Sequence, residues 1–435
     1  MPAPHDEFTG VPLERLLSGL DLPLAQALGR ALAGQDISVN EGVALLGATG
    51  RELLALISAA DELRRRQVGE RVTYVVNRNI NFTNVCIKRC GFCAFSRDYQ
   101  AEEGYFLPLS EVVRRAKEAW EFGATEVCIQ AGLPPHMQGD LYIRICEAVK
   151  AEVPEIHIHG FSPEEVLYGA LRSRCSVKKY LQALQAAGVG SLPGTAAEIL
   201  DQGLRDRVSR GRISARRWIE VITTAHELGI PTTCTMMYGY LETPEQVARH
   251  LALLRDIQRS TGGFTEFVPL SFVHTEAPMV KHGLVAGVRP GPSGLEVLRV
   301  HAVARLMLGN WIPNLQVAWV KEGPRLGQII LSAGANDLGG TLINESISTA
   351  AGAQNGQLMR PAEFRRLIRA AGRIPAERST TYQIRRVFDR PSQDPSEALD
   401  QLDGAGAERF GCYAQLTRME RFRYRQAQAS GEGGE

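Results

Sequence analysis

The sequence predicts an α/β fold, a TIM-type (β/α)8 barrel with a helical extension before it and a tail after it. From Val72 onward, short runs of apolar or β-branched residues alternate with amphipathic stretches of helical periodicity. Eight strand-then-helix units follow one another, which favours a closed barrel over an open doubly wound sheet, although the open sheet stays an alternative. The expected strands span residues 73–82, 126–130, 156–161, 189–192, 231–238, 265–270, 315–320 and 338–343.

The barrel is expected to occupy residues 71–384, between two extensions. Residues 1–70 carry leucines at helical spacing and are expected to form helices, with Arg64 to Arg66 on a solvated helix face. Residues 385–435 are polar and proline-containing at first and glycine-rich at the end, so this extension is expected to be partly mobile at its tip. Within it, the segment 410–422 is apolar enough to dock on the barrel as a strand or helix.

Composition limits the kinds of partner that the protein can have. The 435 residues include 49 basic and 48 acidic ones, a net charge of +1, so no long-range field favours nucleic acid or an acidic membrane. No apolar run reaches membrane-spanning length and the first residues lack a signal-peptide pattern, so a cytoplasmic location is expected. Cysteines scattered singly in apolar or mixed segments are expected to be reduced. They are Cys128, Cys146, Cys175, Cys234 and Cys412.

Three cysteines at the spacing C-x3-C-x2-C follow the first expected strand: Cys86, Cys90 and Cys93. Three thiolates can hold a cluster of four irons by three corners, whereas closed clusters and structural zinc sites usually take four protein ligands. The free iron can bind S-adenosylmethionine (SAM), and one electron then cleaves the sulfonium to a 5′-deoxyadenosyl radical. With Phe92 before its last cysteine, the triad resembles the motif of the radical SAM superfamily. A zinc site completed by a distant His or Cys is the alternative reading.

Turns of small residues at the ends of expected strands are candidates for contact with SAM. The turn at 130–132 follows the second strand, where backbone carbonyls could accept hydrogen bonds from the methionine ammonium. A carboxylate after the fourth strand could accept from a ribose or ammonium group, or could equally cap a helix. A glycine after the fifth strand would let the adenine lie against the backbone. These candidates are Gln130, Ala131, Gly132, Glu198, Tyr238 and Gly239.

Four other side chains are candidates for catalysis or substrate binding. His157 and His159 lie two apart on the third expected strand and so share one face, where they could transfer a proton or bind a phenol. Asp337 and Glu345 belong to a glycine-rich segment at the eighth strand, where polar groups gather at the expected barrel mouth. Ordinary turn and capping roles stay open for both carboxylates.

The runs at 77–97, 129–133, 157–159 and 335–341, with their Thr-Asn-Val-Cys and Phe-Cys-Ala-Phe elements, closely resemble the second subunit of deazariboflavin synthase. The similarity covers roughly residues 71–382 and is more specific than the triad alone. This family consists of radical SAM tyrosine hydroxybenzyl transferases of deazaflavin coenzyme biosynthesis.

The resemblance implies a transferase that joins L-tyrosine to 5-amino-6-(D-ribitylamino)uracil, with one [4Fe-4S] cluster and SAM as cofactors. A 5′-deoxyadenosyl radical would take hydrogen from tyrosine, Cα–Cβ cleavage would release iminoacetate, and the hydroxybenzyl group would add to the uracil. It also implies an electron donor. A separate radical SAM partner, subunit 1 of the synthase, is expected because the sequence holds a single cysteine triad.

Two alternatives stay open at this point. The futalosine-pathway radical SAM enzymes of menaquinone biosynthesis share the two motif elements and would act on a purine nucleoside derivative. A non-catalytic iron-sulfur electron carrier belongs to a different class. It would need a fully ligated cluster, and the count of three cysteines argues against it.

Overall fold

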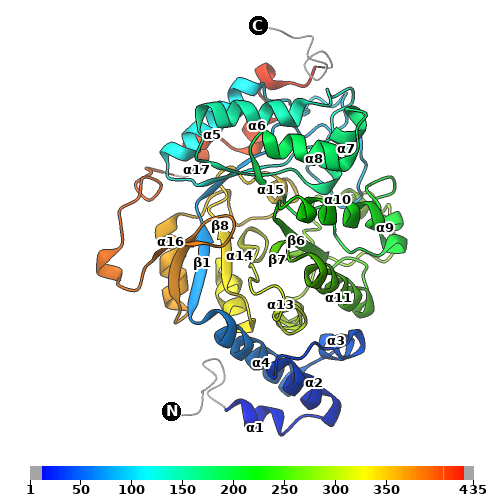
Figure 1. Ribbon diagram of the computed structural model, residues 1–435, viewed down its shortest axis with the longest axis vertical. Helices are drawn as coiled ribbons and strands as arrows, with labels where there is room; N and C mark the ends of the chain where they lie inside the picture. Colours follow the sequence, from blue (N-terminus) through cyan, green and yellow to red (C-terminus); the bar gives the residue numbers. More distant parts are fainter. Residues whose placement is uncertain (1–11, 405, 426–435) are drawn as a thin grey trace.

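The computed structural model describes residues 12–404 and 406–425 and contains the predicted (β/α)8 barrel (Figure 1). Parallel pairing joins β2 to β3, β4 and β5 in order, and joins β6 to β7, while β1 pairs with β8. The barrel strands are β1 (Arg71–Val75), β2 (Asn77–Ile80), β3 (Glu126–Ile129), β4 (His157–Gly160), β5 (Val189–Ser191), β6 (Thr232–Tyr238), β7 (Phe264–Ser271) and β8 (Asp337–Gly340).

Short bridges close these strands into a ring. Leu192 pairs with Thr232 between β5 and β6, and a bridge from residue 78 to residue 343 joins β2 to the end of β8. The seventh position is a short segment whose residues 315 and 316 bridge to β7 and β8. The sequence predicted a strand over 315–320, but helix α14 (Trp319–Ile330) begins inside that range. The β1–β2 segment counts as one barrel strand, so the ring has the eight predicted positions.

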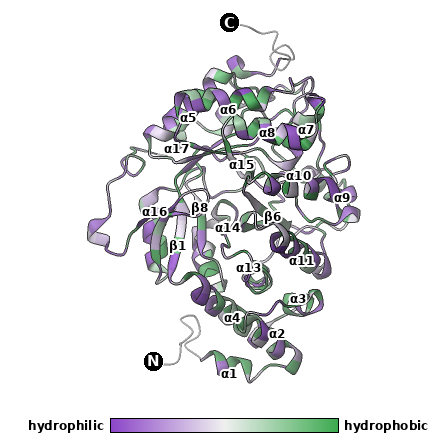
Figure 2. Cartoon of the chain, in the orientation of Figure 1, coloured by the Kyte–Doolittle hydropathy of each residue, from purple (hydrophilic) through white to green (hydrophobic). Residues whose placement is uncertain are grey.

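Helices cover the outside of the ring (Figure 1). Several begin at a serine or threonine whose side chain accepts a hydrogen bond from a backbone N–H of the first turn, as in α7, α10 and α11. Most helices show both hydrophobic and hydrophilic residues along their length (Figure 2). The helices are α5 (Leu109–Glu121), α6 (Leu141–Glu152), α7 (Pro163–Arg172), α8 (Val177–Ala186), α9 (Gln202–Val208), α10 (Ala215–Glu227), α11 (Pro244–Thr261), α12 (Pro278–Lys281), α13 (Gly294–Leu308), α14, α15 (Ile347–Ala350) and α16 (Pro361–Ala370).

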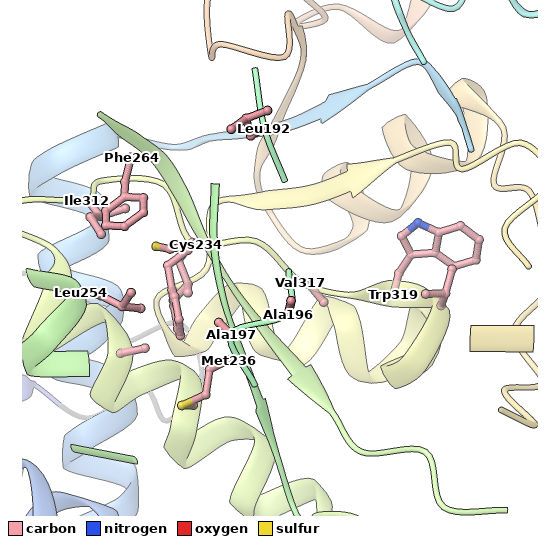
Figure 3. Close-up of a cluster of buried hydrophobic side chains, with 14 of the residues drawn as sticks. Leu192, Ala196, Ala197, Cys234, Met236, Leu254, Phe264, Ile312, Val317 and Trp319 are labelled. Carbon is pink, nitrogen blue, oxygen red and sulfur yellow. The ribbon is translucent and has the colours of Figure 1, made fainter. Parts of the chain in front are cut away.

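The apolar core lies between the strands and this helical layer. Figure 3 shows Cys234 and Met236 of β6 among buried side chains that include Leu254 of α11 and Phe264 of β7. Cys234 and Met236 are both fully buried. Alternate residues of β6 therefore face this core, while Thr235 and Met237 face the barrel mouth.

Four helices precede the barrel, as the leucine periodicity predicted: α1 (Leu13–Leu17), α2 (Leu22–Leu32), α3 (Val39–Leu46) and α4 (Gly50–Val68). Helix α4 packs on α13, and α3 packs on α11. The prediction of a solvated arginine face is wrong for Arg64, which is fully buried and donates to Asp61 at 2.7 Å. Arg65 and Arg66 are exposed and pair with Glu62. In the described part of the chain no helix combines the length and apolarity that crossing a bilayer requires.

The chain after α16 adds two strands that the sequence analysis did not predict. Strand β9 (Ile374–Arg378) pairs in parallel with β1, and β10 (Ile384–Val387) pairs antiparallel with β9. After the short turn η2 (Pro391–Gln393), three further helical turns dock on the barrel, in agreement with the expectation for residues 410–422: α17 (Gly406–Phe410), α18 (Tyr413–Leu416) and η3 (Glu420–Phe422). The glycine-rich tip that was expected to be mobile lies outside the described residues.

Buried histidines give the fold a pH dependence. Burial lowers the pKa values of His159, His226, His250 and His301 to about 4. As the pH falls below about 6.5, these histidines bind protons in the unfolded chain but not in the native state. Their contribution to the free energy of unfolding is therefore fully present above about pH 6.5 and is lost as the pH falls towards about 4.

We expect His301→Gln, on α13, to reduce the slope of the unfolding free energy against pH by about 1 kcal/mol per pH unit between about pH 6 and pH 5. Urea denaturation measures this, with exposed His282→Gln as control; equal slopes in both variants would contradict it.

Candidate active site at the barrel mouth

A cavity of about 330 Å³ opens where the barrel strands end. Catalytic groups of (β/α)8 enzymes lie at this end, because the loops after all strands converge there. Eight of the residues predicted as site residues line it: Cys86, Cys90, Cys93, Gln130, Ala131, Gly132, Glu198 and Glu345. These eight residues are spread over 260 positions of the sequence, and the fold brings them to one cavity.

The cysteine loop is held by backbone hydrogen bonds to three other parts of the chain. Its residue Ile87 donates to Leu133 O at 2.8 Å, and Gly91 donates to Val208 O at 2.8 Å. Met279 N donates in turn to Gly91 O at 2.7 Å. A Cβ on Gly91 would lie 3.0 Å from the Met279 Cβ and 3.1 Å from Val208 O, so a glycine suits this close approach. The loop is thus fixed by the segments after β3, β5 and β7.

The donor set suits a cluster better than a single ion. Cys86, Cys90 and Cys93 line the cavity, and no fourth cysteine is among its described lining residues. No three His, Cys, Asp or Glu side chains of the described chain are placed to share one metal ion. A zinc site needs donors gathered around one ion, whereas each thiolate of a cubane binds a different iron. Burial raises the pKa of Cys86, and that of Cys90 to about 12, so a metal must displace the protons.

The predicted SAM-binding turn packs directly beneath this loop. Gly132 N donates to Thr83 O at 2.9 Å, and a Cβ on Gly132 would lie 2.3 Å from Val85 O. Ala131 N donates to the Glu165 carboxylate at 2.9 Å. Because no side chain fits at position 132, the turn can approach the cysteine loop closely. The contact of this turn with SAM stays a prediction.

A charged group on the same wall includes residues that the sequence analysis missed. Arg212 pairs with Glu198 at 2.7 Å, and its guanidinium lies 5.2 Å from the centre of the Phe92 ring. Glu164 accepts from Ile213 N at 2.6 Å and lies 3.4 Å from the Lys88 ammonium. Glu198, which could have been a helix cap, is thus an ion-pair partner at the cavity.

Glu165 has two roles in the structure. The segment 162–165 forms the capping box that begins α7, where Ser162 N donates to the Glu165 carboxylate at 2.8 Å. The same carboxylate lines the cavity and binds Ala131 N. Burial raises the pKa of Glu165 to about 7, against the hydrogen bonds from Ser162 and Ala131. The capping pattern was visible in the sequence, but the contact with the turn after β3 was not.

His157 and His159 lie inside the barrel and do not line the cavity. Each has a ring nitrogen 2.7 Å from Ser191 Oγ. His159 pairs across strands with Cys128, and neither lines the cavity, whereas Gln130, directly after the end of β3, does. The shared face was predicted, but the histidines lie one layer deeper than the mouth. The two histidines have no direct contact with the cavity, and their catalytic role stays a prediction.

Asp337 and Glu345 have different surroundings. Asp337 is fully buried inside the barrel and accepts from Arg378 Nε at 2.5 Å. Glu345 lines the cavity, and its carboxylate accepts from Ser348 N at 2.7 Å and Thr349 N at 3.2 Å at the start of α15. The capping role left open for Glu345 is therefore present, and the role of each carboxylate in substrate binding stays a prediction.

The structure does not bring Tyr238 and Gly239 to this cavity. Met237 lines it instead, and Tyr238 lines a second cavity of about 250 Å³ on the other side of β6. Successive side chains of a strand point to opposite faces, which separates the two residues. Gly239 has a φ of 93°, and its Cβ would lie 2.3 Å from Pro292 Cδ, so packing requires glycine there. Their contact with SAM stays a prediction.

The C-terminal helical turns α17 and α18 contact the residues around the cysteine loop and the loop after β8. The ring of Tyr413 of α18 lies tilted against that of Phe95, with ring centres 5.5 Å apart, and its hydroxyl donates to Phe95 O at 3.3 Å. Asn84, just before the cysteine loop, donates to the same hydroxyl at 3.4 Å. Asn344 donates to Phe410 O at 3.0 Å. The C-terminal segment therefore supports the cysteine loop and the loop after β8 together.

Solved structures share this fold. The FeFe-hydrogenase maturase HydG from Carboxydothermus hydrogenoformans superposes with a TM-score of 0.64 at 16% identity, covering 85% of this chain and 83% of that one. Methylornithine synthase (PylB) superposes with a TM-score of 0.61 at 20% identity, covering 80% of this chain and 97% of that one. At such identities the likeness concerns the fold alone.

Family models and named relatives match most of the sequence of this chain. The model of the Radical SAM superfamily matches residues 80–254, and that of the CofH/MqnC C-terminal region matches residues 261–390. With the three-cysteine loop after the first barrel strand, these matches define a radical SAM enzyme, which implies a [4Fe-4S] cluster and SAM. Proteins named 5-amino-6-(D-ribitylamino)uracil–L-tyrosine 4-hydroxyphenyl transferase from Methanothermobacter thermautotrophicus and Methanopyrus kandleri are each 48% identical, covering 80% and 85% of this chain and 94% and 98% of their own. The chain therefore belongs to this transferase family.

A third relative is longer than this chain. The FO synthase of Mycobacterium tuberculosis is 47% identical over 345 residues, which are 79% of this chain and 40% of that protein. The family prediction made from the motifs is thus confirmed, and the expected cluster ligands Cys86, Cys90 and Cys93 lie within the superfamily match.

Proposed function

We propose that this enzyme transfers the 4-hydroxybenzyl group of L-tyrosine to 5-amino-6-(D-ribitylamino)uracil, releasing iminoacetate, 5′-deoxyadenosine and methionine. The observation that carries the proposal is the cysteine loop, which offers three thiols to the cavity and no fourth. Family membership at 48% identity over most of the chain supports the choice of substrates. One cluster is proposed, because the described residues supply one such triad.

The cysteines would hold the cluster, and the cluster with SAM would supply a 5′-deoxyadenosyl radical when reduced. The chain's own residues then have three tasks. The turn at 130–132 and Glu198 would orient SAM beside the cysteine loop. The buried walls would exclude water, which a primary radical requires. The remaining cavity surface, from β6 round to α15, would hold the substrates.

Two partners complete the proposal. An external electron donor must reduce the cluster, because no step of the reaction supplies the first electron. The adduct would pass to subunit 1 of deazariboflavin synthase, a separate radical SAM protein. Aligned with 40% of the longer FO synthase, the chain matches one part of that relative, which supports a second component.

Anaerobic reconstitution with iron, sulfide and SAM, followed by mass spectrometry of the products, tests the function. We expect an adduct of the hydroxybenzyl group with the pyrimidine only when tyrosine and 5-amino-6-(D-ribitylamino)uracil are both present. The amount of 5′-deoxyadenosine should match the adduct closely, because a sealed cavity limits uncoupled cleavage. Cleavage of SAM without any adduct, together with turnover of a purine nucleoside derivative, would favour the futalosine-pathway alternative. No cleavage with a fully ligated cluster would favour an electron carrier.

A further inference from the structure

Lys321 is a cation of the cavity that the described residues do not neutralise by direct contact. It lies in the first turn of α14, directly after the seventh barrel position, and lines the cavity. Its ammonium has no hydrogen bond, and no ion pair within 4 Å, to any described residue. The two other cations that line the cavity are both held: Lys88 lies 3.4 Å from Glu164, and Arg212 lies 2.7 Å from Glu198.

Two carboxylates, Glu322 and Glu345, attract the charge of Lys321, but both accept hydrogen bonds from other groups. Glu322 accepts a short hydrogen bond from Ser271 Oγ. Glu345 is occupied by the backbone N–H groups of residues 348 and 349. Burial lowers the pKa of Lys321 although both carboxylates attract its charge, so the ammonium is incompletely compensated. A buried cation of this kind is stabilised when a ligand brings a negative charge.

The position of Lys321 places it across the ring from the segment that follows β4. The seventh position of an eight-strand ring lies opposite the third, which is β4, and near β4 lie the capping glutamates and the turn at 130–132. The neighbouring strand β7 and the segments after β7 and β8 contribute apolar side chains to the cavity lining, among them Leu270, Phe272 and Ile347. A cation in a cavity with apolar walls suits an amphipathic substrate with one anionic end.

We propose that the ammonium of Lys321 binds the α-carboxylate of the amino-acid substrate and thereby selects an amino acid over its amine. This inference rests on the proposed function. The carboxylate is the only formal negative charge of tyrosine at neutral pH, and the pyrimidine co-substrate carries none. A lysine at this point would fix the carboxylate end while the ring lies along the apolar wall, which positions the Cα–Cβ bond without Lys321 touching it.

The test compares tyrosine with tyramine, which lacks only the carboxylate. Binding of each to the reconstituted holoenzyme is measured by calorimetry in the presence of SAM, for the wild type, Lys321→Met and Lys321→Arg. We expect Lys321→Met to weaken tyrosine binding about 10- to 100-fold and to leave tyramine binding unchanged, because one charge-assisted contact is lost. Lys321→Arg should retain most of the preference for tyrosine. Exposed Lys281→Met, outside the cavity, is the matched control and should behave as the wild type.

Each other outcome has a definite meaning. An unchanged ratio of tyrosine to tyramine affinity in Lys321→Met would overturn the proposal, as would equal weakening of both ligands. Loss of SAM binding alone would assign Lys321 to the cofactor and also overturn it. If Lys321→Met fails to fold, Lys321→Gln serves for the same ratio. If the wild type forms no adduct, the proposed function has failed, whereas normal adduct formation with an unchanged ratio rejects only the role of Lys321.

Discussion

We expect Cys86→Ala, Cys90→Ala and Cys93→Ala each to abolish 5′-deoxyadenosine formation. Each thiolate would hold a different iron, so removing one leaves the cluster on two anchors. Loss of an outer-shell partner already costs metal sites about 10- to 100-fold, and loss of a ligand costs more. The three variants should therefore show the same defect, since no fourth cysteine of the described chain lines the cavity to substitute.

Iron and sulfide analysis of anaerobically reconstituted protein measures the loss of the cluster. Chromatography of 5′-deoxyadenosine measures the resulting loss of SAM cleavage. Cys175→Ala is the matched control, because Cys175 is partly buried but lies outside the cavity. It should retain the iron content and SAM cleavage of the wild type. Retained turnover in any triad variant, or zinc at one equivalent with no sulfide in the wild type, would contradict the cluster assignment.

The barrel could be predicted because its strands are local, buried runs. A strand such as β6 is almost entirely buried and reads as a continuous apolar or β-branched segment. Strand β9 carries the charged residues Glu377 and Arg378, which are buried and pair with Arg385 and Asp337 respectively, so its composition gave no strand signal. The seventh position failed as a regular strand for a related reason, since only two of its residues form bridges. In both segments the strand pairing joins residues that are far apart in the sequence, which a local pattern does not reveal.

The place of the candidate site could be predicted where spacing and loop position are informative, as for the cysteine triad and the turn at 130–132, which both line the cavity. Arg212 and Lys321 were missed because an isolated basic residue has no local signature. Arg210 and Arg217, which are equally basic, are respectively exposed and paired with Glu220. For His157 and His159 the period of two residues gave the correct face but not the depth along the barrel axis. Depth depends on the stagger of neighbouring strands, which a single sequence does not encode locally.

Asp337 is fully buried in the barrel and depends on Arg378 for its counter-charge. We therefore expect Arg378→Met to lower the free energy of unfolding by about 3–5 kcal/mol. Arg378 is almost fully buried and pairs with Asp337 at 2.5 Å, and it lies 3.6 Å from Glu266. Its guanidinium also stacks 4.0 Å from the centre of the Tyr382 ring, and the Tyr382 hydroxyl donates to Glu266. Removing the guanidinium leaves two carboxylates in the barrel interior without their cation, which is more costly than the loss of the pair itself.

Urea denaturation measures this effect, with Arg385→Met on the neighbouring strand as control. Arg385 is about half exposed and pairs with Glu377 at 3.2 Å, so its removal should change stability by less than about 1 kcal/mol. Equal losses in the two variants would contradict the importance of the buried network.

A double-mutant cycle then separates structure from catalysis at Asp337. If Asp337 mainly compensates Arg378, Asp337→Asn should destabilise the protein, and the double variant Arg378→Met/Asp337→Asn should lose less than the sum of the single variants, by about 1–3 kcal/mol. The reason is that the second substitution removes a charge that the first has left unpaired. Strict additivity, with turnover lost in Asp337→Asn at unchanged stability, would instead support the catalytic role predicted from the sequence. The barrel interior would then take part in the reaction, although Asp337 does not line the cavity.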